Sequence, residues 1–272
     1  MKTVKGLHEK MGTFENANTS FRQAARCKRY TNEVLAFSMV KEEELLRATE
    51  EIQNLTYRQG EYKIFKVFEP KERLIMALPF YDRVVQHMIC NAIQPVFENG
   101  FYYHSYACRS GKGMHAASDT LYQWMYETEV KQGLRMYAFK GDISKYFASI
   151  PHDKLKDENR RYIGDKKALM LMDDIIDHNG ILPDGVGIPV GNLTSQLFAN
   201  VYGNKLDKFC KHVLHIPYFV RYMDDFIILS DDLEQLKEWV KRIEEFLENE
   251  MLLHINPKST ILYAGNGIDF CG

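Results

Sequence analysis

Three pairs of adjacent aspartates are the residues of this sequence best suited to chemistry, and their surroundings differ. The pair at 231 and 232 precedes an amphipathic stretch and fits a helix N-terminus, where carboxylates accept backbone N–H groups. The pair at 173 and 174 falls inside a helical stretch and fits its polar face. The pair Asp224 and Asp225 lies between two apolar runs, residues 218–220 and 226–229, which predict a β-hairpin with both carboxylates at its tip.

Adjacent carboxylates at the end of a buried sheet repel each other and need cations to neutralise them. Asp142 ends another apolar run, which begins at Met136. If the two strands are neighbours, Asp142 joins Asp224 and Asp225 in one cluster. Hard oxygen ligands of this kind suit Mg²⁺, and two such ions about 3.5–4 Å apart can clamp a phosphoryl transfer. The alternative is a solvated turn, which more often uses Asn-Gly or Asp-Gly.

Composition allows a folded enzyme and excludes several other classes. The 272 residues are 45% hydrophobic and 26% charged, which is typical of globular proteins. No apolar run is long enough to span a membrane. The N-terminus lacks the apolar core of a secretory signal, and the five cysteines form no CxxC pair, so we expect a cytoplasmic protein. His212 and His215 lack a second ligand pair for a metal.

Charge is close to balanced overall but unevenly distributed along the chain. The net charge is −2, which by itself argues against binding nucleic acid. Residues 1–140 carry 20 Lys and Arg against 16 Asp and Glu, whereas residues 141–272 carry 15 against 21. A basic first part that grips phosphates and an acidic second part that holds cations would fit this distribution, although chance asymmetry on solvated faces explains it equally well.

Hydrophobic spacing predicts alternating helices and paired strands, and therefore an α+β fold with an antiparallel sheet. Residues 62–68 and 73–78 read as a hairpin turning at 69–72. Further strands are expected at 136–139, 218–220, 226–229, 252–255 and 261–263. Helices are expected within 17–58 and at 81–97, 118–130 (capped by Ser118), 166–178, 193–212 and 233–251.

The segments around the aspartates resemble those of reverse transcriptases. Residues 222–225, Tyr-Met-Asp-Asp, look like the catalytic signature of that family, and residues 142–147 resemble its first catalytic block. Residues 187–196, 256–258 and 268–272 resemble its second, lysine and primer-grip blocks. Upstream, residues 82–86 and 105–113 are similar to blocks of group II intron-like bacterial enzymes. The resemblance covers roughly residues 60–272.

One detail of the second block indicates which branch of the reverse transcriptase family the chain resembles. Intron-type enzymes usually carry Gln-Gly and then Ser-Pro there, whereas this chain has Val190 and Gly191, then Ser195 and Gln196. This form resembles the reverse transcriptases of diversity-generating retroelements. Related defence-associated enzymes could share it.

The resemblance implies the fingers and palm of a right-hand polymerase, the palm being an antiparallel sheet backed by helices. Residues 1–135 would be mainly fingers with a helical N-terminal region, and residues 136–150 the palm with its first catalytic block. Residues 151–187 would be a helical return to the fingers, and residues 188–272 would form the palm up to the primer grip. Family members carry a helical thumb after that block, so we expect the thumb, and an RNase H domain, to be absent here.

The resemblance also implies a catalytic centre. Two Mg²⁺ ions, with Mn²⁺ as the alternative, would be held by Asp142, Ile143, Asp224 and Asp225. They would activate the primer 3′-hydroxyl and neutralise charge on the triphosphate. Lys258 would protonate the departing pyrophosphate, although an exposed lysine after a proline turn explains it nearly as well.

Other residues gain binding roles from the same resemblance. Lys66 and Arg73 would hold the triphosphate, with Lys63 and Lys71 as rivals. Phe147 would be a steric gate against a 2′-hydroxyl, with core packing as the alternative. The substrate would also meet Val190, Gly191, Gln196 and Tyr222, and the template backbone would meet Arg109 and Lys112.

The function implied is an RNA-directed DNA polymerase that extends a DNA or RNA primer with deoxynucleoside triphosphates on an RNA template, in a retroelement and with an accessory protein. A defence-associated or group II intron-type reverse transcriptase is the alternative of the same fold. A nucleotide cyclase would also use two metals, but the blocks around Gly191 and Gly272 do not favour it. A catalytically silent RNA-binding scaffold is the alternative of another class, and the three aspartates argue against it.

Overall fold

The chain folds as two units, each built from two separate stretches of sequence. The computed structural model describes residues 3–68 and 72–270. Unit 1 comprises residues 1–100 and 151–198, and unit 2 comprises residues 101–150 and 199–272. These boundaries differ from the expected divisions at 135/136 and 187/188, because residues 101–135 pack with the strands of unit 2. The naming of fingers and palm stays a prediction. No helix among the described residues is long and apolar enough to cross a membrane.

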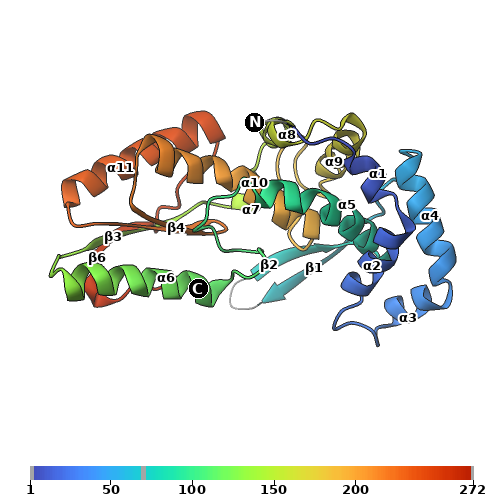
Figure 1. Ribbon diagram of the computed structural model, residues 1–272, viewed down its shortest axis with the longest axis horizontal. Coiled ribbons are helices and arrows are strands. Elements are labelled where there is room, and N and C mark those ends of the chain that lie inside the picture. Colours follow the sequence, from blue (N-terminus) through green and yellow to red (C-terminus); the bar gives the residue numbers. More distant parts are fainter. Residues whose placement is uncertain (1–2, 69–71, 271–272) are drawn as a thin grey trace. The chain divides into compact units, whose positions relative to one another are not determined.

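Unit 1 is mainly helical (Figure 1). Its helices are α1 (Leu7–Met11), α2 (Phe14–Ala24), α3 (Asn32–Met39), α4 (Lys41–Gln53), α5 (Phe80–Glu98), α8 (His152–Tyr162) and α9 (Lys166–Asp177). Helix α5 forms the centre of this core, since Val84, Met88 and Ile93 on its apolar positions are fully buried and α1, α2 and α3 pack against it. Helix α10 (Leu193–Lys208) begins in unit 1 and ends in unit 2.

The predicted hairpin of unit 1 is confirmed. Strands β1 (Lys63–Phe68) and β2 (Glu72–Ala77) pair antiparallel, with Lys63 opposite Ala77 and Phe68 opposite Glu72. Of the expected turn at 69–72, residues 69–71 lie outside the described residues, and Glu72 already belongs to β2. The side chain of Arg73 also lies outside what the structure describes. Pro79 precedes α5, where its fixed φ suits a helix start.

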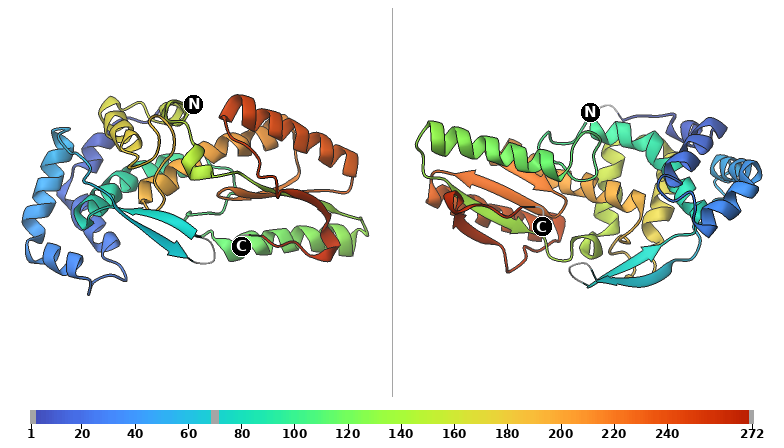
Figure 2. Two further views of the ribbon diagram at one scale, coloured as in Figure 1. Left: turned by 180° about the vertical axis from the view of Figure 1, so that it is seen from behind. Right: turned by 90° about the horizontal axis from the view of Figure 1, so that it is seen from below.

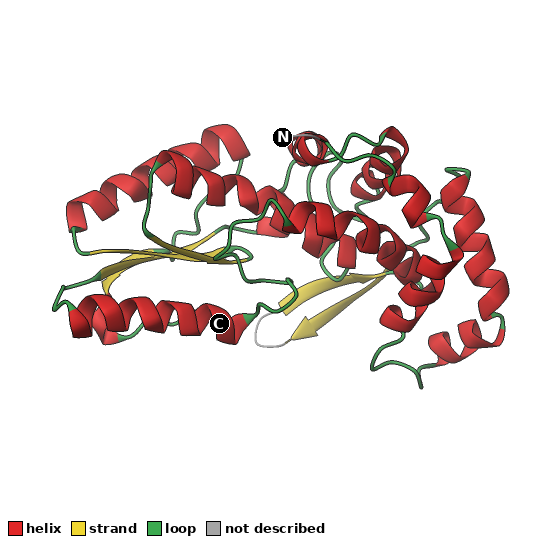
Figure 3. Cartoon of the chain, in the orientation of Figure 1, coloured by secondary structure: helices red, strands yellow, loops and turns green. Residues whose placement is uncertain are grey.

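Unit 2 is built on a four-stranded antiparallel sheet in the order β4-β5-β3-β6. Figure 3 shows its strands in yellow between helices drawn in red. Its elements are α6 (Met114–Met125), β3 (Tyr137–Asp142), α7 (Tyr146–Ser149), β4 (Tyr218–Tyr222), β5 (Asp225–Ser230), α11 (Leu233–Phe246) and β6 (Thr260–Tyr263). Helix α6 covers one face of the sheet, while α11 and the end of α10 cover the other (Figures 1 and 2). Both faces are therefore buried, which explains why β5 reads as a continuous apolar run.

Two expectations about secondary structure are wrong. Ser118 does not cap a helix, because α6 already begins at Met114 after Gly113 and reaches Met125, followed by a π-helical turn to Lys131. Residues 252–255 are not a strand. They leave α11 and its π-helical extension through Leu252, whose positive φ of 53° turns the chain, and only Ile255 forms an isolated bridge, to Ile143.

Candidate active site

The two strands that carry the predicted carboxylates are direct neighbours. β3 pairs antiparallel with β5, and their register places Asp142 opposite Asp225. Directly opposed residues in an antiparallel pair have Cα atoms about 4.5–5.5 Å apart and point to the same face of the sheet. The prediction of a shared carboxylate site required these two strands to be adjacent, and they are.

Asp224 lies in the two-residue turn that joins β4 to β5. Tyr222 pairs with Asp225 across this turn, leaving Met223 and Asp224 as its central residues. The Asp224 carbonyl accepts a hydrogen bond of 3.2 Å from the Ile143 backbone N–H, which ties the turn to the residue after Asp142. Met223 has a φ of 58°, in the left-handed region that a methionine rarely adopts.

Asp142 is held in place by the loop at residues 256–259. Its backbone N–H donates to Ser259 Oγ at 3.0 Å, and its carbonyl accepts from the Asn256 N–H at 2.7 Å. The Asn256 side-chain Nδ2 also donates to Asp142 Oδ2 at 2.6 Å. Sequence reasoning assigned this loop only the role of Lys258 and missed Asn256 and Ser259. The signal was present in the lysine block, which begins at Asn256.

The donors at this site suit a hard divalent cation. A carboxylate offers two oxygens and about four lone-pair positions, so the amide of Asn256 on Oδ2 is compatible with a cation on the same group. Asp142, Asp224 and Asp225 are all partly exposed, which allows solvent and ligands to reach them. Across the described part of the chain, no three His, Cys, Asp or Glu side chains already converge as a metal site. The expected ions at Asp142, Ile143, Asp224 and Asp225 thus stay a prediction.

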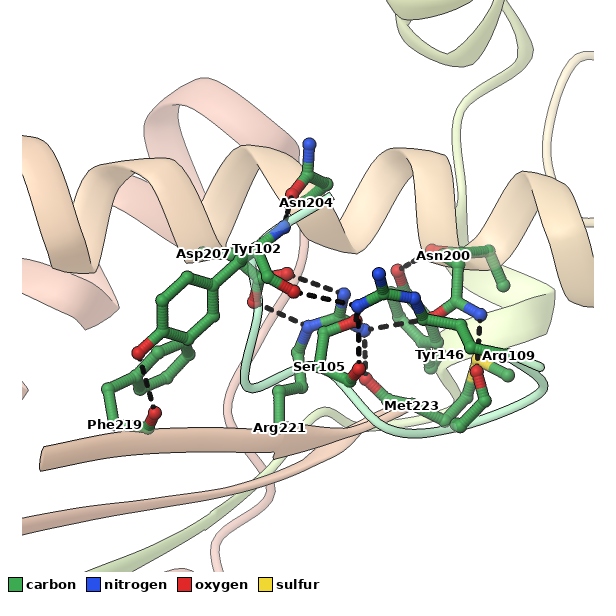
Figure 4. A network of polar contacts seen from close by, with 12 residues as sticks. Tyr102, Ser105, Arg109, Tyr146, Asn200, Asn204, Asp207, Phe219, Arg221 and Met223 are labelled. Atoms are coloured by element: carbon green, nitrogen blue, oxygen red, sulfur yellow. Dashed lines mark hydrogen bonds and ion pairs between the residues drawn. The ribbon is translucent and has the colours of Figure 1, made fainter. Parts of the chain in front are cut away.

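A buried ion pair lies directly behind the turn (Figure 4). Arg221 on β4 and Asp207 on α10 both have fully buried side chains, and Arg221 also donates to the Met223 carbonyl at 2.8 Å. Burial alone would lower the pKa of Arg221, but the charge and hydrogen bonds of Asp207 raise it above its usual value. Sequence reasoning missed this pair. The visible signal was Arg221, a charged residue directly after the apolar run 218–220.

Two aromatic candidates lie in unit 2. Phe147 lies on α7 and is partly exposed, whereas its neighbour Tyr146 is buried and donates to the Ala199 carbonyl at 2.7 Å. Phe147 is therefore not simply a core residue, which is consistent with the gate prediction. Tyr222 is also partly exposed, at the end of β4.

The three basic side chains in unit 2 that have predicted roles differ in their surroundings. Lys258 has an exposed side chain, and its backbone N–H donates to Asn256 Oδ1 at 3.1 Å. Arg109 donates to the carbonyls of Tyr102 and Ser105 at 2.7 and 2.8 Å. Lys112 donates to the Tyr103 carbonyl at 2.9 Å. Arg109 and Lys112 thus stabilise their own loop, and their contact with a template stays a prediction.

The remaining candidates lie in unit 1, where β2 and the second block meet. The Val190 carbonyl accepts from the Met76 N–H at 3.1 Å. A Cβ on Gly191 would lie 3.2 Å from Ile75 Cγ2 and 3.3 Å from the Met76 carbonyl oxygen, so glycine permits this close approach. Gln196 is partly buried in the first turn of α10.

The predicted triphosphate pair can be located only in part. Lys66 on β1 is exposed and forms an ion pair of 2.6 Å with Glu72, which contributes little to stability in solvent. Lys63 is exposed on the same strand, while Lys71 lies outside the described residues. Arg73 pairs with Val67 in the hairpin register. The roles of Lys66 and Arg73 stay predictions.

Comparison with known families agrees with this geometry. The sequence model of the family described as "Reverse transcriptase (RNA-dependent DNA polymerase)" matches residues 66–272. The protein YkfC of Escherichia coli is 25% identical over an alignment of 237 residues, and the match covers 70% of this chain and 60% of YkfC. An uncharacterized 91 kDa protein in the cob intron of Schizosaccharomyces pombe is 29% identical over 137 residues, 48% of this chain and 16% of that protein. The putative COX1/OXI3 intron 2 protein of Saccharomyces cerevisiae is 22% identical over 253 residues, 70% of this chain and 29% of that protein.

Solved telomerase structures share the fold. Apo telomerase from Candida tropicalis superposes with a TM-score of 0.58 at 13% identity, over 79% of this chain and 46% of that one. Telomerase from Candida albicans, in complex with a fragment of telomeric RNA, gives a TM-score of 0.57 at 12% identity, over 80% of this chain and 46% of that one. At such identities the likeness establishes the α+β fold alone. The chain spans less than two thirds of each of these relatives and structures.

Proposed function

The chain belongs to the reverse transcriptase family, and we propose that it catalyses RNA-directed DNA synthesis from a primer 3′ end. The observation that carries this proposal is the register of β3 and β5, which opposes Asp142 to Asp225 and leaves Asp224 in the adjoining turn. Silent nucleic-acid scaffolds have no need for three carboxylates at one sheet end. The substrates would be an RNA template, a DNA or RNA primer and deoxynucleoside triphosphates.

In this proposal each group of residues has one task. Asp142, Asp224 and Asp225 hold divalent cations, with the backbone of Ile143 beside them. When bound, these cations would activate the primer 3′-hydroxyl and neutralise negative charge on the triphosphate. Lys258 is exposed and donates a proton to the departing pyrophosphate. Phe147, partly exposed on α7, excludes a ribose 2′-hydroxyl.

Binding of the nucleic acid and triphosphate is assigned to the basic and second-block residues. Lys66 and Arg73 contact the triphosphate. In unit 1, Val190, Gly191 and Gln196 contact the nucleotide, and in unit 2, Tyr222 supports the primer end. Arg109 and Lys112 contact the template backbone, which positions an A-form hybrid without reading its sequence.

The test is primer extension on an RNA template with a titration of Mg²⁺ and, separately, of Mn²⁺. A polymerase adds template-directed deoxynucleotides only when a divalent cation is present. A scaffold binds the same hybrid without extending it at any metal concentration, and that result would overturn the proposal.

Two finer assignments remain open to experiment. The second block, Val190 and Gly191 with Ser195 and Gln196, supports an enzyme of a diversity-generating retroelement. The names of two relatives, which place them in introns, support the intron-type alternative. A near-identical repeat pair that differs at adenines in the neighbouring DNA would favour the first assignment, and an enclosing intron would favour the second.

A further inference from the structure

We propose that Arg221 is the positioning residue for the turn that carries Asp224 and Asp225, and that Asp207 orients Arg221 for this task. Arg221 contacts no reacting atom in this account and acts through the Met223 carbonyl. The proposal rests on the proposed function, because it explains how the carboxylates of that site are held.

The orientation of the guanidinium is fixed by a two-point ion pair. Arg221 Nε lies 2.6 Å from Asp207 Oδ1, and Arg221 Nη2 lies 2.7 Å from Asp207 Oδ2. Both side chains are 0% exposed. A planar guanidinium held at two points by a carboxylate cannot rotate, and its third nitrogen then points in one direction. Asp207 on α10 therefore determines where Nη1 of Arg221 lies (Figure 4).

That third nitrogen contacts the turn itself. Arg221 Nη1 donates to the Met223 carbonyl at 2.8 Å and approaches Asn200 Oδ1 at 3.5 Å. Met223 has a φ of 58°, a conformation that L-residues avoid unless their surroundings impose it. A hydrogen bond from a buried charge to the carbonyl of this residue is such a constraint. The strained residue precedes Asp224, so its conformation sets the direction of that carboxylate.

The strand position of Arg221 is fixed independently. Its backbone N–H donates to the His104 carbonyl at 3.0 Å, and its carbonyl accepts from the Tyr106 N–H at 2.9 Å. Space for the guanidinium exists because residue 203 is glycine, where a Cβ would lie 2.6 Å from Nη1. Backbone and side chain of Arg221 are thus both anchored, and its bond to the Met223 carbonyl ties the turn to this anchored residue.

A purely stabilising role is the competing explanation, and the chain permits variants that separate the two. The double variant Arg221→Met with Asp207→Leu replaces the ion pair by apolar groups, an exchange that often leaves stability unchanged, but it removes the bond to Met223. Arg221→Lys keeps the charge beside Asp207 but lacks the planar fork. Ile243→Ala on α11 is the control, since it destabilises the same unit at a fully buried position away from the turn.

Three readouts are measured on the 272-residue chain: kcat and KM for primer extension, affinity for Mn²⁺ by calorimetry, and hydrogen exchange of peptides covering residues 222–226. For both Arg221 variants we expect kcat to fall at least tenfold with KM for deoxynucleotide nearly unchanged. Mn²⁺ affinity should weaken severalfold, and exchange should accelerate at the turn ahead of the rest of unit 2. Ile243→Ala should lower thermal stability without these local changes.

The proposal is overturned if either folded Arg221 variant keeps the parental kcat, Mn²⁺ affinity and turn exchange, or if its losses only match those of Ile243→Ala. If the double variant does not fold, Arg221→Lys decides the question by the same readouts. Failure of the proposed function looks different: the parent would show no metal-dependent extension, while faster exchange and weaker Mn²⁺ binding in the Arg221 variants would still identify the positioning role.

Discussion

At the scale of single residues, Asp142 differs from an ordinary strand-end carboxylate in how completely it is fixed. Its N–H, its carbonyl and one carboxylate oxygen all have partners in the loop at residues 256–259. A carboxylate held this way approaches a cation with little reorganisation, which is the physical requirement for an electrostatic catalyst. Asn256 supplies two of these contacts and is therefore the residue to test.

Asn256→Ala is expected to lower the free energy of unfolding by about 1–2 kcal/mol, since a hydrogen bond to a partly exposed carboxylate is lost. Chemical denaturation monitored by circular dichroism measures this change. Thr260→Ala, at an exposed position four residues on, serves as the control and should change stability by less than about 0.5 kcal/mol. Equal losses in the two variants would show that the Asn256 bond does not fix Asp142.

A second residue-scale prediction concerns His104, which lies among Tyr103, Tyr106 and Trp124. Burial, together with the charges of Lys112 and Lys211, lowers the pKa of His104 to about 4. The unfolded chain, with a histidine pKa near 6.5, binds this proton more readily than the folded one. Folding stability contributed by neutral His104 is therefore present above about pH 6.5 and is lost as the pH falls toward 4.

The measurement for His104 is the free energy of unfolding at several pH values between 4 and 7. His104→Gln should flatten the loss of stability on acidification, whatever its effect at neutral pH. His115→Gln, at an exposed position on α6, should leave the parental pH slope in place. If the unfolding free energy of His104→Gln falls with pH as steeply as that of the parent, His104 is not the source of this pH dependence.

At the scale of elements, the antiparallel strands that carry the site were predictable and several of their supports were not. The apolar runs around Asp142 and Asp224 have the period and length of buried strands, so β3, β4 and β5 follow from local sequence. Their order in the sheet is a long-range property, and only the recognition of the aspartates suggested that β3 lies beside β5.

The missed features depend on contacts between segments distant in sequence. Residues 252–255 look like a strand locally, but Leu252 adopts a positive φ and the segment instead bridges Ile143. Arg221 follows the apolar run 218–220 in the sequence, yet its partner Asp207 lies on α10 and shares no local pattern with it. Helix α8 was not predicted as a separate element, because three residues on its buried face are polar: His152, Glu158 and Asn159.

The junction of β2 with the second block offers an element-scale prediction. Gly191 has a φ of +117° and packs against Ile75 and the Met76 carbonyl, whereas Gly185 has a φ of +75° with open space where a Cβ would stand. Gly185→Ala should cost about 1 kcal/mol of unfolding free energy from backbone strain alone. Gly191→Ala should cost about 2–3 kcal/mol, because crowding adds to the strain. Denaturant titration measures both, and equal costs would contradict the proposed close approach.

At the scale of the whole molecule, the residues with predicted roles are distributed over both units. The carboxylates, their supporting loop and the Arg221 ion pair all belong to unit 2, while Lys66, Arg73, Val190 and Gly191 belong to unit 1. The sequence predicted the carboxylates and the unit 1 residues, but not the contacts of Asn256 and Ser259 or the Arg221 ion pair. The boundary at 100/101 could not be predicted, because α6 joins unit 2 only through its packing on the sheet.

The central claim is that Asp142, Asp224 and Asp225 form the metal-dependent centre of a DNA-synthesising enzyme. The most direct test compares primer extension on an RNA template by the parent chain and by Asp224→Asn, at equal protein concentration and with Mg²⁺ in excess. Asparagine has the same shape but one charge fewer, so folding and hybrid binding should be retained while extension falls by at least a thousandfold. Substantial residual extension in a folded Asp224→Asn variant would contradict the account.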